Sequence, residues 1–468
     1  MPFGHGFHKT GRCPGPRLAG GMKTVERTMS SVLDAIKEAG LVGEGGAGFP
    51  THVKLACKAE VVIGNGLECE PMLRTDRLIM ERWPEKVAAG LRLAMEATGA
   101  SKGVIALKNK YHAATDALKS VIQNEPSIKL HLMDSFYPAG DEQEIVYEVT
   151  GKRVPAAGLP IDVGAVIQNV GTLVHIAEAA EGKPFTEKLV TVNGEVGRPA
   201  VYLVPIGTPI KLLIEASQGP RDLSNHTLVI GGPAMGRLSK NIDEVVQKTT
   251  GGVLVFSDSH PLIQKKTGTK EMDWKLAKAV CCQCMYCTLM CPRNALGLNV
   301  QPHKVMRALA AGAPKSIGDP QSIFSCCDCG LCTYYACNFQ LAPSRVMQYM
   351  KQELAKQGMK PQKREPAPVP GNMDDIKVPT HRLTMRLGIE KYDKDLPLIE
   401  NGITVTSIKL PLRMHIGAPS EPLVKAGDRV EKGQLVARAA GNVSANLHAS
   451  IGGTIASVSE SAIEIRVN

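Results

Sequence analysis

The stretch Cys281-Cys282-Gln283-Cys284-Met285-Tyr286-Cys287-Thr288-Leu289-Met290-Cys291-Pro292 decides how the middle of this chain folds. Four of its cysteines follow the spacing C-x2-C-x2-C-x3-C-P, in which short loops turn backbone amides toward sulfur while the thiolates bind iron. A second run repeats the pattern with one extra residue, Ala336, before its last cysteine. We expect a [4Fe-4S] cluster from each run, with these metal ligands: Cys281, Cys284, Cys287 and Cys291 in the first, and Cys326, Cys329, Cys332 and Cys337 in the second.

The last cysteine of each run is expected to bind the cluster that the other run forms. In two-cluster ferredoxins that cysteine binds the other cluster, which would place Cys291 with the second triplet and Cys337 with the first. The extra residue leaves the ligand role of Cys337 open. Structural zinc is disfavoured because zinc sites usually combine two separated C-x2-C pairs, and disulfides are disfavoured because no segment resembles a secretory signal. Cys282 and Cys327, each beside a first ligand, are expected to be packed or spare thiols without a ligand role.

Length, composition and charge limit the number of domains and the kinds of partner to expect. A chain of 468 residues with 43% hydrophobic and 4% aromatic residues is expected to fold into several domains around separate cores. It contains no apolar run of the length that crosses a membrane. The formal charge of +10 falls once bound clusters and a flavin phosphate are counted, at roughly −2 each. Lys and Arg are scattered, so nucleic acid is not an expected partner.

The segment Gly43-Glu44-Gly45-Gly46-Ala47-Gly48-Phe49-Pro50 formally contains G-x-G-x-x-G. A dinucleotide fingerprint should follow a strand, whereas here an amphipathic helix over 31–39 is expected to precede it. The ordinary Rossmann interpretation therefore fails. What remains is a glycine-rich loop that opens a helix over 51–57 and lets backbone N–H groups approach a phosphate or a flavin ring.

Hydrophobic periodicity predicts alternating strands and helices in the first part of the chain. The strands are expected at 60–63, 103–107, 128–133 and 165–167, and the helices near 85–97, 111–123, 141–149 and 171–181. Such alternation is typical of an α/β sheet domain.

The fold class is multidomain α/β. We expect an unstructured tail (1–28), an α/β domain (29–185), a small α+β module (186–261), an α-helical ferredoxin-type domain (262–356), a proline-rich linker (357–379) and a β-rich domain (380–468). In the β-rich domain, residues 427–433 read GDRVEKG, the G-D-x-V-x-K-G pattern of biotinyl- and lipoyl-like barrel-sandwich domains. The segment that should present the carrier lysine reads NLHAS (446–450), so we expect a structural module and not a swinging arm.

Four segments carry a family resemblance: VGEGGAGFPTHVK (42–54), NGLECEP (65–71), YPAGDEQEIVYEVTGKRVP (137–155) and VIQNVGT (166–172). They resemble the Rossmann-like FMN/NADH-binding core shared by the NADH-oxidising subunit of respiratory complex I and the RnfC protein of the Rnf electron-transport complex. The α+β module is then similar to an SLBB domain. The RnfC protein carries its barrel-sandwich domain at the N-terminus. The C-terminal position found here resembles the cobalamin reductases of propanediol-utilisation microcompartments.

The resemblance implies a set of cofactor-binding residues. Those expected to contact FMN or NADH are Gly43, Gly45, Gly46, Gly48, Phe49, Lys54, Asn65, Glu68, Glu70, Tyr137, Gly140, Asp141, Glu142, Asn169 and Thr172. Two positions depart from the family pattern, since Glu44 stands where an arginine is frequent and Leu67 where an acidic residue is usual.

The same resemblance implies a function. NADH gives up two electrons as hydride, iron–sulfur clusters accept one at a time, and FMN converts between the two, so no acid/base catalytic residue is expected. The implied acceptor is the cobalt of cobalamin, reduced towards cob(I) for a cobalamin adenosyltransferase, in the cytoplasm inside a bacterial microcompartment whose shell proteins are further partners. Two alternatives stay open: an electron-input RnfC protein of a membrane Rnf complex, and a non-catalytic scaffold.

Overall fold

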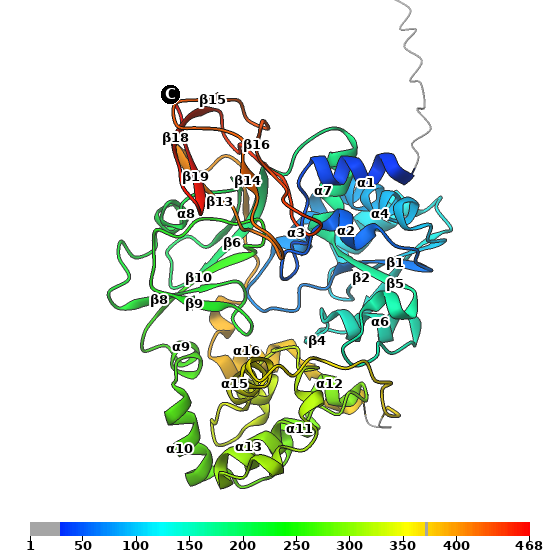
Figure 1. Ribbon diagram of the computed structural model, residues 1–468, viewed down its shortest axis with the longest axis vertical. Helices are drawn as coiled ribbons and strands as arrows, with labels where there is room; N and C mark the ends of the chain where they lie inside the picture. Colours follow the sequence, from blue (N-terminus) through cyan, green and yellow to red (C-terminus); the bar gives the residue numbers. More distant parts are fainter. Residues whose placement is uncertain (1–28, 370–372) are drawn as a thin grey trace, which may run out of the picture.

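The computed structural model describes residues 29–369 and 373–468, so the expectation for the tail over 1–28 lies outside the described residues (Figure 1). The helical domain with both cysteine runs lies at the bottom of Figure 1, below the two sheet domains, and the barrel-sandwich domain lies at the top. Within the described ranges, no helix is long and apolar enough to cross a bilayer.

A four-stranded parallel sheet in the order β3-β2-β1-β5 forms the centre of the first domain. Its strands are β1 (Val61–Gly66), β2 (Lys102–Lys108), β3 (Ile128–Met133) and β5 (Ala165–Asn169). The helices are α1 (Met29–Glu38), α2 (Thr51–Leu55), α3 (Thr75–Arg82), α4 (Pro84–Thr98), α5 (His112–Ile122), α6 (Glu142–Thr150) and α7 (Val170–Ala180), with a 3-10 turn η1 at Pro160–Val163. The expected strands and helices are confirmed, and the sequence pattern missed α3, η1 and the two-residue strand β4 (Phe136–Tyr137).

The glycine-rich loop joins α1 to α2 and not a strand to a helix, as its sequence context indicated. It nevertheless reaches the carboxyl end of the sheet, because a β-carbon built on Gly45 would lie 3.2 Å from the Cβ of Asn169, the last residue of β5. Ligands of open α/β sheets bind at this end of the strands. The loop thus sits where a flavin could be held.

The second domain is a mixed six-stranded sheet in the order β12-β7-β6-β10-β8-β9. Its strands are β6 (Glu187–Gly194), β7 (Ala200–Pro205), β8 (His226–Ile230), β9 (Arg237–Ser239), β10 (Gly252–Ser257) and β12 (Leu398–Ile399), and α8 (Ile210–Ala216) packs on it. Strand β12 comes from beyond the helical domain and pairs in parallel with β7.

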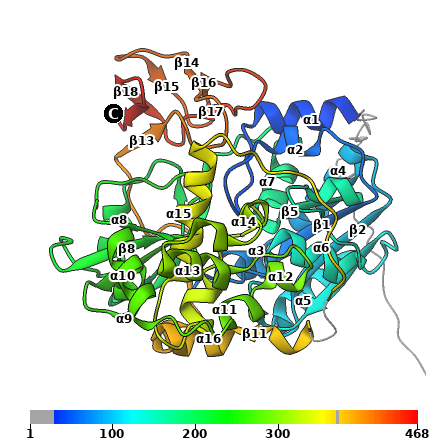
Figure 2. The ribbon, with the colours of Figure 1, turned by 60° about the horizontal axis from the view of Figure 1, so that its bottom comes forward.

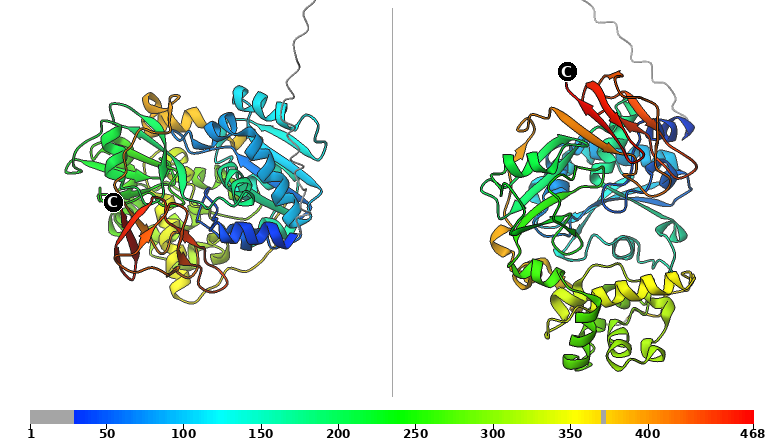
Figure 3. Two further views of the ribbon diagram at one scale, coloured as in Figure 1. Left: turned by 90° about the horizontal axis from the view of Figure 1, so that it is seen from above. Right: turned by 60° about the vertical axis from the view of Figure 1, so that its left-hand side comes forward.

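Short helices separated by loops make up the third domain, which stands apart from the sheets in the side view (Figure 3). They are α9 (Pro261–Lys266), α10 (Lys270–Val280), α11 (Tyr286–Leu289), α12 (Pro292–Ala295), α13 (Pro302–Ala311), α14 (Pro320–Ile323) and α15 (Pro343–Lys356), with η2 at Pro314–Ile317. A one-turn π-helix, η3 (Cys332–Ala336), lies inside the second cysteine run.

The segment after α15 is more structured than a linker. Val378 is buried, and β11 (Val378–Pro379) pairs antiparallel with β4 (Phe136–Tyr137). Strand β4 belongs to the first domain, which carries the expected flavin motifs and is called the flavin-like domain. The following helix, α16 (Thr380–Leu387), packs through Leu383 and Leu387 into the core that contains Cys329 and Tyr334, at the base of the view in Figure 2. Short turns η4 (Asp374–Ile376) and η5 (Glu390–Tyr392) flank it. Residues 357–369 of the expected linker contain no helix or strand, whereas the end of the segment pairs with the first domain and α16 packs against the helical domain.

The barrel-sandwich domain starts at β13 and consists of two small sheets. The first contains β13 (Ser407–Pro411), β15 (Arg429–Val430), β18 (Gly453–Val458) and β19 (Ala462–Arg466); the second contains β14 (Glu421–Pro422), β16 (Leu435–Arg438) and β17 (Leu447–His448). The segment 446–450 is buried, and the carbonyl of Asn446 accepts a hydrogen bond from Lys248 at 2.7 Å. Its burial fits the expected structural module without a swinging arm.

Candidate flavin and iron–sulfur site

One cavity of about 1520 Å³ opens where the first two domains, the helical domain and the barrel-sandwich domain meet. The residues expected from the flavin motifs gather there from four separate segments. Those that line it are Gly43, Gly45, Gly46, Gly48, Phe49, Lys54, Asn65, Glu68, Glu70, Gly140, Asp141, Glu142 and Asn169. Tyr137 and Thr172 are buried behind the wall, where Tyr137 donates a hydrogen bond to Glu70 and Thr172 accepts one from the amide of Glu44.

The glycine-rich loop leaves space on its cavity side. A β-carbon on Gly46 would meet no protein atom within 4 Å. Gly48, in contrast, has φ +73° and would bring a β-carbon to 2.9 Å from Thr249 Cγ2. The loop is thus fixed by the protein at Gly48 and open to a ligand at Gly46, as a cradle for a flavin requires.

Two expected acidic residues hold backbone amides. The carboxylate of Glu68 accepts hydrogen bonds from Thr75 Oγ1 and from the amide of Asp76, both at 3.0 Å, and so caps the start of α3. Glu70 accepts hydrogen bonds from the amides of Ala234 and Met235, both at 2.8 Å. It thus joins the flavin-like domain to the loop between β8 and β9 of the second domain. Burial raises the pKa of Glu70, although these amides lower it. Both carboxylates therefore have a structural role beside any contact with a ligand.

The remaining motif residues are also held in place. Lys54 pairs with Glu142 at 2.7 Å, and Asn65 donates to the carbonyl of Gly140 at 3.2 Å. The side chain of Lys54 is 27% exposed and lines the cavity, so its ammonium can still reach a phosphate. The glycine-rich loop, the turn at 140–142 and Lys54 all line the same cavity. The sequence motifs alone could not show this.

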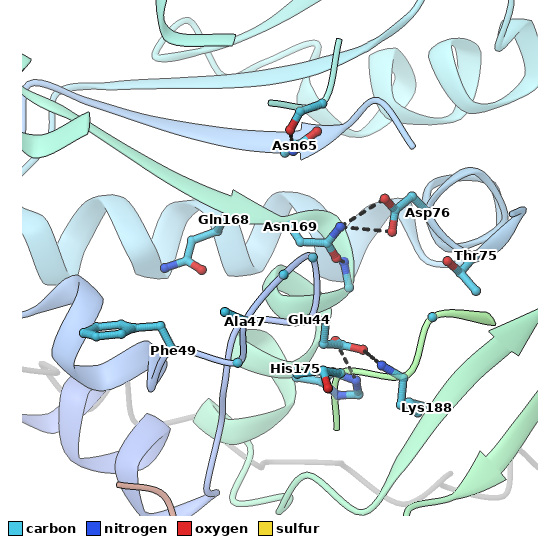
Figure 4. Close-up of a pocket in the computed structure, with 18 of the residues that line it drawn as sticks. Glu44, Ala47, Phe49, Asn65, Thr75, Asp76, Gln168, Asn169, His175 and Lys188 are labelled. Carbon is cyan, nitrogen blue, oxygen red and sulfur yellow. Dashed lines mark hydrogen bonds and ion pairs between the residues drawn. The ribbon is translucent and has the colours of Figure 1, made fainter. Parts of the chain in front are cut away.

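Sequence reasoning missed three polar residues of the cavity, Asp76, His175 and Lys188, which Figure 4 shows. Asp76 lies opposite Asn169, whose Nδ2 donates to both carboxylate oxygens at 3.0 Å. Below them, Lys188 donates to Glu44 at 2.9 Å, and His175 Nε2 lies 3.4 Å from the same carboxylate. Burial, and then the Glu68 and Glu44 carboxylates, raises the pKa of Asp76 well above its usual range. No motif marked these residues, although the arginine missing at Glu44 was a sign that its partners had changed.

The cysteines form two thiol sets that exchange their last members. The outer thiol set contains Cys281, Cys284, Cys287 and Cys337: burial, and then the charges of Cys337, Cys281 and Cys284, raises the pKa of Cys287 to about 12. The inner thiol set contains Cys291, Cys326, Cys329 and Cys332. Burial, followed by Cys326, Cys291 and then Cys287 of the outer set, raises the pKa of Cys332 well above its usual value. Cys327 and burial, and then Cys291 and Cys332, raise the pKa of Cys329. This grouping agrees with the crossover expected from the spacing. Among the described residues, no three His, Cys, Asp or Glu side chains are close enough together to hold a single metal ion.

The extra residue of the second run is absorbed by the π-helix Cys332–Ala336. A π turn accommodates one residue more than an α turn, and such turns are frequent at functional sites. Cys337 therefore returns to the neighbourhood of Cys281 and Cys284 despite its irregular spacing. The arrangement fits Cys337 as a ligand of the outer set.

The two sets differ in exposure. Cys291, Cys329 and Cys332 are buried, whereas Cys284 and the neighbouring Cys282 are exposed. Around the outer set, Trp274, Met285, Tyr286 and Leu289 are 42–49% exposed. On the other side, Cys327 and Cys329 line the flavin-like cavity. The residues thus fit a flavin in the cavity, a cluster at its wall and a second cluster toward the surface.

Comparison with protein families gives four matches along the chain. They are the Nuo51 FMN-binding domain at residues 36–178, the SLBB domain at 189–238, a 4Fe-4S dicluster domain at 280–342 and the RnfC barrel sandwich hybrid domain at 389–466. The expected fold class is confirmed.

Curated relatives decide the family. Cobalamin reductase PduS of Salmonella typhimurium is 39% identical over 452 residues, which cover 95% of this chain and 98% of that protein. The chain belongs to the PduS cobalamin reductase family. A second PduS, from Citrobacter freundii, is 38% identical and covers 95% of this chain and 99% of the relative. A component of the Na⁺-translocating ferredoxin:NAD⁺ oxidoreductase complex of Acetobacterium woodii is 35% identical over 57% of this chain and 60% of its own length. This PduS family member is an oxidoreductase with FMN-binding and 4Fe-4S dicluster domains.

Proposed function

We propose that this oxidoreductase takes electrons from NADH and passes them, through one FMN and two [4Fe-4S] clusters, to the cobalt of a corrinoid. The observation that carries the proposal is the single cavity that gathers the flavin motifs and is walled on one side by Cys327 and Cys329. FMN, when bound, would accept the two electrons of one hydride and release them one at a time. The glycine-rich loop would hold the flavin, and Cys329 would bring a ligand of the inner set to the cavity wall, while Cys291, Cys329 and Cys332 are buried.

The choice of acceptor is supported by family membership. Both PduS relatives are cobalamin reductases that match nearly their full length to this chain. The expected partners follow from that reduction: a cobalamin adenosyltransferase that consumes the reduced corrinoid, and shell proteins of a bacterial microcompartment in which both would be enclosed.

A second candidate function is electron input to a membrane complex of the Rnf type. It is favoured by the 35% identity to the ferredoxin:NAD⁺ oxidoreductase component from Acetobacterium woodii, but this match spans 57% of the chain. The position of the barrel-sandwich domain after the clusters favours the reductase. A non-catalytic scaffold would need neither the cavity nor its motif residues.

The test is anaerobic reduction of hydroxocobalamin by the purified, cluster-reconstituted protein. NADH should bleach bound FMN and then reduce the corrinoid, with NADPH as the comparison donor. If flavin bleaches while hydroxocobalamin stays oxidised and a ferredoxin is reduced instead, the Rnf-type function replaces the proposal. A protein that binds no FMN after reconstitution would be a scaffold.

A further inference from the structure

We infer that the inner thiol set holds the cluster that receives electrons first, and that Arg293 is the residue that positions this cluster against the flavin cavity. The inference rests on the proposed function, because it assigns an order to the same cofactors. Of the residues it concerns, Arg293 belongs to no flavin or cluster motif.

The cavity wall supplies the first observation. Cys329, a member of the inner set, lines the cavity, and so does its neighbour Cys327. No member of the outer thiol set is among the lining residues. The hydroxyl of Tyr137, from the flavin-like domain, has one proton, which it shares between the carbonyl of Cys329 at 2.7 Å and the carboxylate of Glu70 at 3.2 Å. The loop that carries the inner ligands is therefore bonded directly to flavin-site residues.

Arg293 makes the second connection between the two domains. It follows Cys291-Pro292, the position at which the first run gives its cysteine to the inner set. One of its Nη atoms donates to Asp141 at 2.6 Å, with side chains only 13% and 11% exposed. Its guanidinium also lies close to the thiol of Cys327, in the second run, and Asp141 and then Cys327 raise the pKa of Arg293 against the effect of burial. Asp141 caps α6 and lines the cavity, so a buried cation fixes the flavin-like domain to both cysteine runs at once.

A cation beside the inner thiol set also affects how easily a cluster bound there is reduced. A cubane with four thiolates carries a charge of roughly −2 that becomes more negative on reduction. The guanidinium of Arg293 would stabilise the reduced form and offset the Asp141 carboxylate, 2.6 Å away, which would otherwise oppose reduction. Arg293 thus favours the inner cluster as first acceptor by position and by charge. Each NADH yields NAD⁺, one proton and two electrons, which pass singly, so the inner cluster is reduced and reoxidised twice per NADH.

The order is tested by removing one cluster at a time. In Cys284→Ala, which disrupts the outer set, NADH should still reduce the inner cluster, read by electron paramagnetic resonance. In Cys329→Ala, NADH should bleach the flavin but leave the outer cluster oxidised, although dithionite reduces it. The opposite pattern, with the outer cluster reduced by NADH in Cys329→Ala, would overturn the order.

The role of Arg293 is tested against a matched control. Arg345→Met removes an Arg–Asp pair of similar burial, between Arg345 and Asp273 at 2.6 Å, that lies outside the cavity wall. Arg293→Met should lower the reduction potential of the inner cluster, measured by dye-mediated titration without NADH, and slow its reduction by NADH about tenfold or more. Arg293→Lys, which keeps the charge, should retain most of the potential, and it replaces Arg293→Met if that variant does not fold. Equal potentials and rates in the Arg293 and Arg345 variants would refute the positioning role.

Failure of the proposed function has a different signature. If NADH does not bleach the flavin of the unmodified protein, the donor is wrong, and photoreduction of the bound flavin still reports which cluster is reduced first.

Discussion

Gly46 and Gly48 lie two residues apart and constrain the glycine-rich loop in different ways. At Gly48 the left-handed φ and the nearby Thr249 demand glycine for the protein's own sake. At Gly46 the φ lies outside the left-handed region and no protein atom stands within 4 Å, so only a ligand can exclude a side chain. The left-handed backbone conformation is therefore required at Gly48 and not at Gly46.

Replacing Gly46 by valine should release FMN and abolish NADH oxidation, because the added methyl groups would occupy the space of the flavin. The clusters should keep their visible absorbance, since their cysteines lie in another domain. FMN is measured by fluorescence after denaturation of the purified variant. Gly452→Val, at an exposed glycine outside the cavity, is the control. Full FMN occupancy in Gly46→Val would remove the loop from the flavin site.

The cysteine spacing predicts two complete clusters. We expect iron and acid-labile sulfide at about eight each per reconstituted chain, as two cubanes require. The π-helix puts Cys337 beside Cys281 and Cys284, so any deficit from the irregular spacing should fall on the outer cluster. Values near four of each would mean that only one cluster is built.

Motif residues could be predicted one by one, whereas their partners could not. The glycines and Asn169 carry recognisable patterns in sequence. Arg293 and Lys188 meet their partners, Asp141 and Glu44, only in the folded chain, because 152 and 144 residues separate them in the sequence. No local pattern records such a pairing.

At the scale of elements, Lys248 joins the flavin-like domain to the barrel-sandwich domain. Its ammonium donates to the carbonyls of Gly40 and Asn446, both at 2.7 Å, and the side chain is fully buried. His415 and His448, which face it from the barrel-sandwich domain, both have a pKa lowered first by burial and then, among other groups, by Lys248. This contact explains why segment 446–450 is buried.

Burial lowers the pKa of Lys248 to about 7, from 10.5 in its ordinary state. Between these values the unfolded chain binds more protons than the folded one, so this residue makes the free energy of unfolding increase as the pH rises from 7 towards 10.5. Lys248→Met should remove that increase. Thermal unfolding of both proteins at pH 7 and pH 9 measures it, and identical pH shifts of Tm would contradict the prediction.

Long helices and strands with a clear hydrophobic period could be predicted from the sequence. Short elements that depend on contacts with residues far away in the sequence could not. Helix α3 begins where Glu68, seven residues upstream of Thr75, caps its amides, and no usual capping residue precedes it. Strand β12 is only two residues long and exists because β7 offers it an edge. Helix α16 joins the core around Cys329 because Leu383 and Leu387 are buried there. In each case the stabilising contact is non-local.

At the scale of the whole molecule, the domains form a path from the cavity to the surface of the helical domain. If electrons cross both clusters, Cys284→Ala and Cys329→Ala should each abolish reduction of hydroxocobalamin. Flavin bleaching by NADH should persist in both, because neither cysteine belongs to the FMN-binding domain. Corrinoid reduction at the unmodified rate in both variants would refute a path through the clusters.

The unequal exposure of the two thiol sets has a consequence for durability. Oxygen and chelators reach Cys284 at the surface, while Cys291, Cys329 and Cys332 are shielded by packed side chains. Damage in air should therefore proceed in two stages, with half of the iron lost early and the rest held much longer. A purified sample would pass through a half-stripped state that still oxidises NADH but no longer delivers electrons outward.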